Sequence, residues 1–196
     1  MKTLLHVGCG PEDKSDNKGF DNDEWKEIRF DIDEDVKPDI VGTLTDMSLV
    51  ETASVDAVYS AYNIDHIYAH EVPIALGEFF RVLKDDGFAV IKCPDLQSVA
   101  EAVAQDKFLD TLYVSPIGPI AAIDIMYGNR QEISDGNAYM EKKVGFTYSV
   151  LNGSCAEVGF KTRYGGRSKD AFELTLVAFK QKKSEDEIIK IATPFF

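Results

Sequence analysis

Residues 4–10 read Leu4-Leu5-His6-Val7-Gly8-Cys9-Gly10, a short apolar run that stops at two closely spaced glycines. Such a run is typical of a buried β-strand followed by a tight turn. In an open parallel sheet, ligands bind beyond the carboxyl ends of the strands, which is where this turn would lie. Because glycine lets the backbone approach a ligand closely, we expect the turn to leave amide groups pointing outward.

An acid follows this turn at the distance that nucleoside binding favours. Residues 25–32 form a second apolar stretch, in which Asp31 lies 21 positions after Gly10. An acid about 20 residues beyond a glycine turn commonly accepts hydrogen bonds from a ribose diol. Asp33 is a second candidate. Taken alone, the glycines are most simply explained as a structural turn and the acid as a cap at the end of a strand. Together, the glycine turn and the acid favour a nucleoside-type cofactor.

Further strands are expected at residues 39–41, 55–61 and 88–93. Between the last two, four apolar residues at spacings of four, three and four share one face of a helix: Val72, Leu76, Phe79 and Leu83. We expect Gly87 to end this helix in the left-handed conformation. Asp95 is placed to cap a second helix. Alternating strands and helices indicate a parallel sheet covered on both faces.

The last third of the chain has a different pattern. Residues 107–147 are rich in glycine, proline and aromatic residues with weak periodicity, and predict an irregular cap between the fifth and sixth strands. Residues 159–163 and 171–180 predict two strands joined by a glycine-rich turn. With no helix between them, these strands must pair antiparallel. We therefore expect one α/β domain over residues 1–180, with a seven-stranded, mostly parallel sheet and an antiparallel last strand, followed by a tail at 181–196.

Composition narrows the class of protein. The 196 residues carry a net charge of −13, with 44% hydrophobic and 28% charged residues, close to an ordinary globular protein. Such acidity opposes binding to nucleic acid or to an anionic membrane, and no apolar run approaches the ~20 residues that span a bilayer. The three cysteines are far apart and odd in number. Reduced thiols, no leader peptide and a cytoplasmic location are therefore expected.

Two other nucleotide-binding patterns are disfavoured. A dinucleotide fingerprint needs a third glycine at Asp13, and the phosphate-binding pattern GxxxxGK[ST] is absent. Metal binding by His66 and His70, four residues apart, lacks further ligands, so we predict no metal. Cys9 is interpreted as a small residue in a tight turn rather than a nucleophile, because no base is placed to activate it.

Five stretches resemble class I S-adenosylmethionine-dependent methyltransferases, most closely the small-molecule branch often called type 11. They are residues 4–10 (Leu-Leu-His-Val-Gly-Cys-Gly), 30–33 (Phe-Asp-Ile-Asp), 38–42 (Pro-Asp-Ile-Val-Gly), 54–60 (Ser-Val-Asp-Ala-Val-Tyr-Ser) and 79–87 (Phe-Phe-Arg-Val-Leu-Lys-Asp-Asp-Gly). The resemblance runs from about residue 3 to 104, and residues 158–161 and 174–180 resemble the family's final hairpin. It implies a three-layer Rossmann-like fold and methyl transfer from S-adenosylmethionine to a small molecule.

The resemblance also implies roles for individual residues. The methionine part of the cofactor would pass over Gly8, Cys9 and Gly10. Asp31 would hold the ribose hydroxyls, Ile32 would lie against the adenine, and Asp46 and Met47 would border the adenine edge. Ser60, Ala61 and Tyr62 would lie near the sulfonium and the substrate. Asp65 and His66 stand where the family usually has a Glu-His pair.

Several positions depart from the family pattern. His6 stands where an acid is usual and Glu12 where a third glycine is usual. The polar segment 11–25 has no apolar stripe, so we expect the helix after the first strand to be missing or very short. A non-catalytic methyltransferase-like binding or scaffold protein is therefore the alternative function.

His66 is the best candidate base, since an unperturbed histidine titrates near neutral pH. Its simpler interpretation is a histidine bonded to a nearby carboxylate such as Asp65. Aromatic residues of the cap, with the stretches 127–129 and 137–140, are the expected substrate contacts. The chain ends in Pro194-Phe195-Phe196, which we expect to dock on a neighbouring molecule, and a homodimer stays open.

Overall fold

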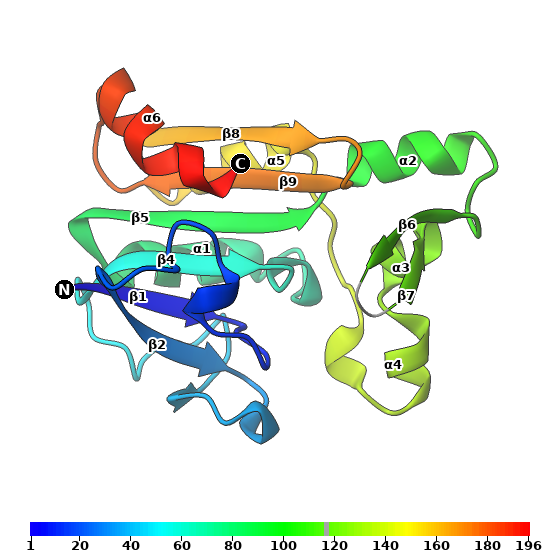
Figure 1. Cartoon of the computed structure of the whole chain (residues 1–196), viewed down its shortest axis with the longest axis horizontal. Helices are drawn as coiled ribbons and strands as arrows, with labels where there is room; N and C mark the ends of the chain where they lie inside the picture. The colour runs from blue at the N-terminus through cyan, green and yellow to red at the C-terminus, as the bar shows by residue number, and fades with distance from the viewer. Residues whose placement is uncertain (116–117) are drawn as a thin grey trace.

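The computed structural model describes residues 1–115 and 118–196 and is built on one seven-stranded sheet (Figure 1). The strand order is β3-β2-β1-β4-β5-β9-β8. The strands are β1 (Lys2–Val7), β2 (Trp25–Asp31), β3 (Ile40–Val41), β4 (Val55–Ala61), β5 (Leu83–Pro94), β8 (Thr162–Ser168) and β9 (Glu173–Phe179). The first five are parallel, whereas β9 runs antiparallel between β5 and β8. The predicted fold class is confirmed.

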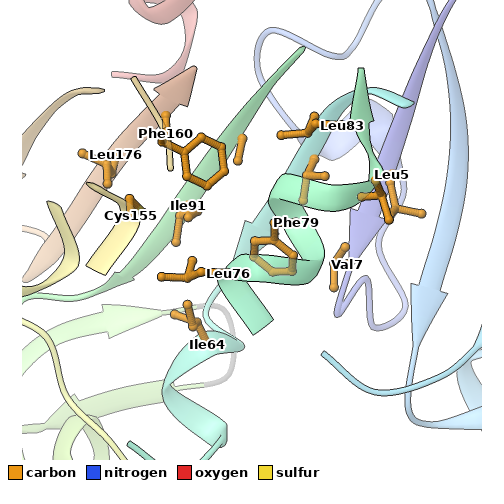
Figure 2. Packing of buried hydrophobic residues seen from close by; sticks show 14 of the residues in the cluster. Leu5, Val7, Ile64, Leu76, Phe79, Leu83, Ile91, Cys155, Phe160 and Leu176 are labelled. Atoms are coloured by element: carbon orange, nitrogen blue, oxygen red, sulfur yellow. The ribbon is translucent and has the colours of Figure 1, made fainter. Parts of the chain in front are cut away.

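Helices α1 (Val72–Val82) and α5 (Tyr148–Glu157) cover one face of the sheet. The predicted apolar stripe of α1 is buried, with Leu76 and Phe79 facing the strands (Figure 2). They pack against Leu5 and Val7 of β1 and against Ile91 of β5. Burial of this stripe stabilises the helix more than its intrinsic propensity does.

The predicted end of this helix is wrong. The helix ends at Val82, and Leu83 already pairs with Val55 in the sheet. The next pair is Phe88 with Ala57, so residues 84–87 bulge out of the ladder. Burial of Leu83 in the core therefore draws the chain into a strand before Gly87 is reached. Gly87 does not adopt the left-handed conformation.

The opposite face is covered without a helix between β1 and β2. Residues 8–24 form a loop with a single 3-10 turn, η1 (Lys14–Asp16), as expected from its lack of an apolar stripe. Phe20 from this loop is fully buried on the sheet. The C-terminal segment, α6 (Glu185–Ala192) and η5 (Thr193–Phe195), completes the cover.

The end of the chain therefore docks on its own sheet, which corrects the expectation of docking on a neighbour. The Phe195 ring is buried and lies 5.0 Å from the ring of Phe20. It also lies 6.1 Å from the ring of Phe88 on β5. Phe196 is the exposed end residue and meets Tyr164 edge to face.

Residues 96–115 and 118–147 lie beyond the carboxyl ends of the parallel strands (Figure 1). Asp95 caps the first helix there as predicted, accepting a hydrogen bond from Gln97 N. The elements are α2 (Leu96–Ala104), the hairpin β6 (Thr111–Ser115) and β7 (Gly118–Ala121), α3 (Ala122–Tyr127), α4 (Arg130–Ser134) and η4 (Ala138–Met140). Val99, Ala122 and Ile125 form a small core of their own. The division into domain, cap and tail stays a prediction.

The last two strands pair antiparallel as predicted, but their bounds differ. Gly165 and Gly166 lie inside β8 and not in the turn, which spans residues 169–172. A Cβ at Gly165 would lie 2.4 Å from Thr175 O, so this glycine permits a close approach between strands. In the part of the chain that the structure describes, no helix is long and apolar enough to cross a membrane.

Candidate active site

The glycine turn after β1 takes a left-handed backbone at both glycines, with φ of 63° at Gly8 and 53° at Gly10. A Cβ at Gly8 would lie 2.3 Å from Nδ2 of Asn63, so that side chain occupies the space directly against Gly8. A Cβ at Gly10 would meet no atom within 4 Å. Open space for a ligand therefore lies at Gly10 rather than at Gly8.

The expectation of outward-pointing amides is wrong. The amides of Gly8 and Cys9 donate to Phe30 O, at 2.8 and 3.3 Å, and Gly10 N donates to Oδ2 of Asp31 at 2.7 Å. The parallel pairing of β1 with β2 brings these acceptors alongside the turn. The amides of the turn are therefore already hydrogen-bonded within the protein. A phosphate group would find no free amide at these three residues, which disfavours a dinucleotide cofactor.

Asp31 ends β2 with its carboxylate beside Gly10, as its sequence position predicts. The residue is 8% exposed and accepts hydrogen bonds from Gly10 N and, at 2.9 Å, from Asp33 N. A carboxylate has about four acceptor positions, so two remain for a ligand. The next residue, Ile32, is 45% exposed and offers an apolar surface beside this carboxylate.

Arg29 is a residue of this site that the sequence analysis missed. Its guanidinium donates to Gly10 O at 2.5 Å, to Glu12 O at 3.1 Å and to the carbonyls of Val36 and Lys37. It thereby ties the glycine turn to the loop after β2, which contains η2 (Glu34–Val36). An arginine within a strand gives no signal of such partners.

His6, just before the turn, and Cys9, within it, are both buried. His6 Nδ1 lies 2.8 Å from Oε1 of Glu27, and the other oxygen of Glu27 accepts from Lys14 N at 3.0 Å. His6 is therefore a paired, buried residue that anchors the loop replacing the first helix. Burial raises the pKa of the Cys9 thiol to about 11, which fits a structural residue and not a nucleophile.

The segment after β4 closes over the turn. Asn63 Nδ2 donates to Val7 O at 2.6 Å, and its Oδ1 accepts from the Ser60 hydroxyl. Tyr62, half exposed, has a left-handed φ of 56°, and its hydroxyl donates to Glu173 at the start of β9. Burial, together with the Glu173 carboxylate, raises the pKa of Tyr62. Such backbone strain in a bulky residue often accompanies a functional site.

The two residues expected at the adenine edge have different surroundings. Met47 is fully buried in the main core, and its amide donates to Glu78 Oε2 at 2.9 Å. Only its main chain can therefore border a ligand without repacking the core. Asp46 is exposed, and hydrogen bonds from Ser48 lower the pKa of its carboxyl. Their assignment to adenine stays a prediction, as does that of Ala61.

His66 lies in η3 (Ile64–His66), with Nδ1 at 2.9 Å from Glu141 O. A carbonyl only accepts, so Nδ1 carries the proton and Nε2 of the neutral ring is left as the acceptor. The bond to Asp65 that the simpler interpretation assumed is not formed. His70 stacks on Tyr68, and no group of three or more metal-binding side chains occurs among the described residues.

A hollow of about 230 Å³ lies between η3, the end of β5 and the cap. Its lining includes Asp65 and Lys142, whose carboxylate and ammonium are 2.8 Å apart. Of the stretches predicted to contact substrate, Tyr127 lines this hollow, whereas residues 128–129 and 137–140 do not, and the role of these stretches stays a prediction. His66 is not part of the lining either.

Comparison with known proteins agrees with this arrangement. Residues 5–91 match a family model described as "Methyltransferase domain". That match covers the glycine turn, Asp31 and the segment after β4. The part of the chain from β1 into β5 is thus similar to a methyltransferase domain. A search of curated proteins found no match to this sequence.

Solved structures share the methyltransferase fold at low sequence identity. They include a Burkholderia thailandensis 1,6-didemethyltoxoflavin-N1-methyltransferase with bound 1,6-didemethyltoxoflavin and S-adenosylhomocysteine (TM-score 0.58, 12% identity, 92% of this chain and 72% of that chain). A SAM-dependent methyltransferase from Archaeoglobus fulgidus aligns similarly (TM-score 0.58, 12% identity, 91% and 86%). A Bordetella parapertussis protein does so as well (TM-score 0.58, 14% identity, 92% and 62%). The chain thus spans about three fifths of the length of the Bordetella protein.

Proposed function

We propose that this protein transfers a methyl group from S-adenosylmethionine to a small-molecule acceptor. The observation that carries the proposal is the end of β2, where a nearly buried Asp31 carboxylate with free acceptor positions lies between open space at Gly10 and the exposed Ile32. A ribose diol fits such a carboxylate. The absence of free amides at the turn suits a cofactor without phosphate.

The residues present fit this cofactor on chemical grounds. S-adenosylmethionine, when bound, supplies an activated methyl group on a sulfonium. Asp31 would hold the ribose, Ile32 would cover the adenine, and Gly10 would leave room for the chain that leads to the sulfonium. Tyr62 would line the route to the acceptor. Since Asn63 fills the space at Gly8, the methionine part would lie nearer Gly10 than the sequence predicts.

His66 would serve as the proton acceptor for a protonated acceptor group that extends to its ring, which lies outside the lining of the hollow. The Glu141 carbonyl accepts from Nδ1, so Nε2 is the acceptor nitrogen of the neutral ring. Methyl transfer is otherwise an in-line displacement, in which holding the two reactants in register supplies much of the rate. The similar fold of a methyltransferase that binds 1,6-didemethyltoxoflavin supports a small molecule as the acceptor.

Titration with S-adenosylhomocysteine, followed by calorimetry, tests the proposal. One-to-one binding of micromolar strength supports a working cofactor site. A folded sample that does not bind millimolar ligand would instead support the non-catalytic alternative. The cytoplasmic location and the homodimer stay predictions.

A further inference from the structure

The cap hollow has one polar end and one apolar wall. Lys142 and Asp65 form the polar end, while Leu96, Ile125 and Met126 contribute to the apolar wall. The volume of about 230 Å³ lies below the range of about 300–1,000 Å³ that is usual for drug-sized ligands, so the hollow suits a single ring. Tyr127 stands exposed at its rim.

The polar end is an ion pair with unfilled hydrogen-bonding capacity. Asp65 is 1% exposed and the Lys142 side chain 14% exposed, so both are largely removed from water. Neither oxygen of the Asp65 carboxylate accepts a well-directed hydrogen bond within the described residues. Desolvating two charges is costly unless further hydrogen bonds satisfy them. A ligand group that both donates and accepts would supply such bonds.

The charge of the pair selects a neutral ligand. The two charges cancel, so an anion placed there would meet the Asp65 carboxylate and a cation would meet the Lys142 ammonium. A hydroxyl avoids both conflicts, because its oxygen accepts from the ammonium while its hydrogen is donated to the carboxylate. An aromatic or aliphatic ring carrying that hydroxyl would bury its apolar body against the opposite wall.

The hollow is joined to the proposed cofactor site by one short segment. Asn63 reaches Gly8 in the glycine turn, and Asp65, two residues later, lines the hollow. The cap is held to the same segment, since the amides of Lys143 and Val144 donate to Asp65 O at 2.9 and 3.2 Å. The position of the pair is therefore fixed relative to both the turn and the cap.

We propose that the cap hollow is the acceptor site and that it binds a neutral, hydroxyl-bearing ring through Asp65 and Lys142. This inference rests on the proposed function, because an acceptor site presupposes a methyl donor. Phenol is the probe, with anisole, benzoate and benzylamine as analogues that lack the donor hydrogen or carry a charge.

Nuclear magnetic resonance of the ¹⁵N-labelled full chain measures the binding. Phenol is expected to shift the amide signals of Asp65, Tyr127 and residues 143–145, and each analogue to bind about tenfold more weakly. The charge-neutral double variant Asp65→Asn/Lys142→Gln should lose phenol binding to the same extent and keep binding S-adenosylhomocysteine. Lys107→Gln is the matched control, because this lysine of the cap is exposed, does not line the hollow and should leave phenol binding unchanged.

Met126→Phe provides a second variant should the double variant fail to fold, since it fills the hollow without touching the ion pair. Loss of phenol binding in this variant supports the inference. Benzoate or benzylamine binding as tightly as phenol, or phenol shifts elsewhere on the chain, would overturn it. Binding of S-adenosylhomocysteine without phenol overturns this inference alone. Phenol binding without S-adenosylhomocysteine overturns the proposed function, and with it the role of the hollow as an acceptor site.

Discussion

Gly10 donates its amide to Asp31 across 2.7 Å, which joins the turn after β1 to the acid at the end of β2. The bond spans 21 residues of sequence and uses one acceptor position of the carboxylate. Asp31 therefore has two tasks, since it holds the turn in place and keeps acceptor positions for a ligand.

Replacing Asp31 by asparagine should weaken S-adenosylhomocysteine binding about tenfold or more, because hydrogen bonds to a charged group contribute about 1.5–3 kcal/mol. Asparagine keeps one side-chain oxygen that can accept from the turn. Alanine would leave the amides of Gly10 and Asp33 without their acceptor and would destabilise the loop. Calorimetry provides the measurement, with the exposed Asp35→Asn as a control of equal charge change. Equal affinities of Asp31→Asn and the wild type would refute the ribose assignment.

Gly8→Ala should lower the free energy of unfolding by about 1–3 kcal/mol, through a left-handed backbone and a clash with the Asn63 side chain. Gly153→Ala is the matched control, because Gly153 lies in α5 with open space around its Cα. We expect it to be neutral or stabilising by up to about 1 kcal/mol. Urea denaturation distinguishes the two, and a Gly8→Ala variant as stable as the wild type would contradict the packing described.

Arg29→Lys should destabilise the glycine turn, because a single ammonium does not reproduce the forked donors that bind four carbonyls. A lower melting temperature and a weaker affinity for S-adenosylhomocysteine are expected together. Lys26→Gln, an exposed change on the same strand, should alter neither. If Arg29→Lys behaves like Lys26→Gln, the guanidinium does not hold the turn.

Phe195→Ala should cost about 3–5 kcal/mol of stability, because its ring is buried against Phe20 and Phe88 where a crossover helix is absent. The adjacent Phe196→Ala removes a ring that is 55% exposed and should cost much less. Thermal unfolding of the two variants gives the comparison. Equal losses would mean that the C-terminal segment does not cover this face.

The three cysteines should resist alkylation in the native protein. All are buried, and burial raises the pKa of the Cys155 thiol to about 12 and that of Cys9 to about 11, so at pH 8 both are protonated and unreactive. Mass spectrometry after iodoacetamide treatment should find no label under native conditions and three labels in denaturant. Rapid native labelling of Cys9 would show that the turn opens.

The sequence predicts the elements that follow from local pattern. The stripe of α1 and the strand at 55–61 are visible because burial imposes a period on neighbouring residues. The predicted end of α1 is wrong, because the helix stops where Leu83 pairs with Val55. That contact is distant in sequence and leaves no local pattern. Gly165 was assigned to a turn for the same reason, because its close approach to β9 leaves no local signal.

Some residues of the candidate site could also be predicted from the sequence, and others could not. The place of Asp31 beside the turn could be predicted, because its distance in sequence from Gly10 is the one usual for an acid of this kind. Arg29 could not be predicted, because its partners are main-chain carbonyls of two separate loops, the glycine turn and the loop after β2. The pairing of Asp65 with Lys142 joins η3 to the cap, which are far apart in sequence, so only the folded chain brings the two residues together.

Calorimetric titration of the wild-type protein with S-adenosylhomocysteine tests the central claim most directly. Our account predicts one-to-one binding of micromolar strength. The absence of binding at millimolar ligand, in a sample whose thermal unfolding shows it to be folded, would contradict it.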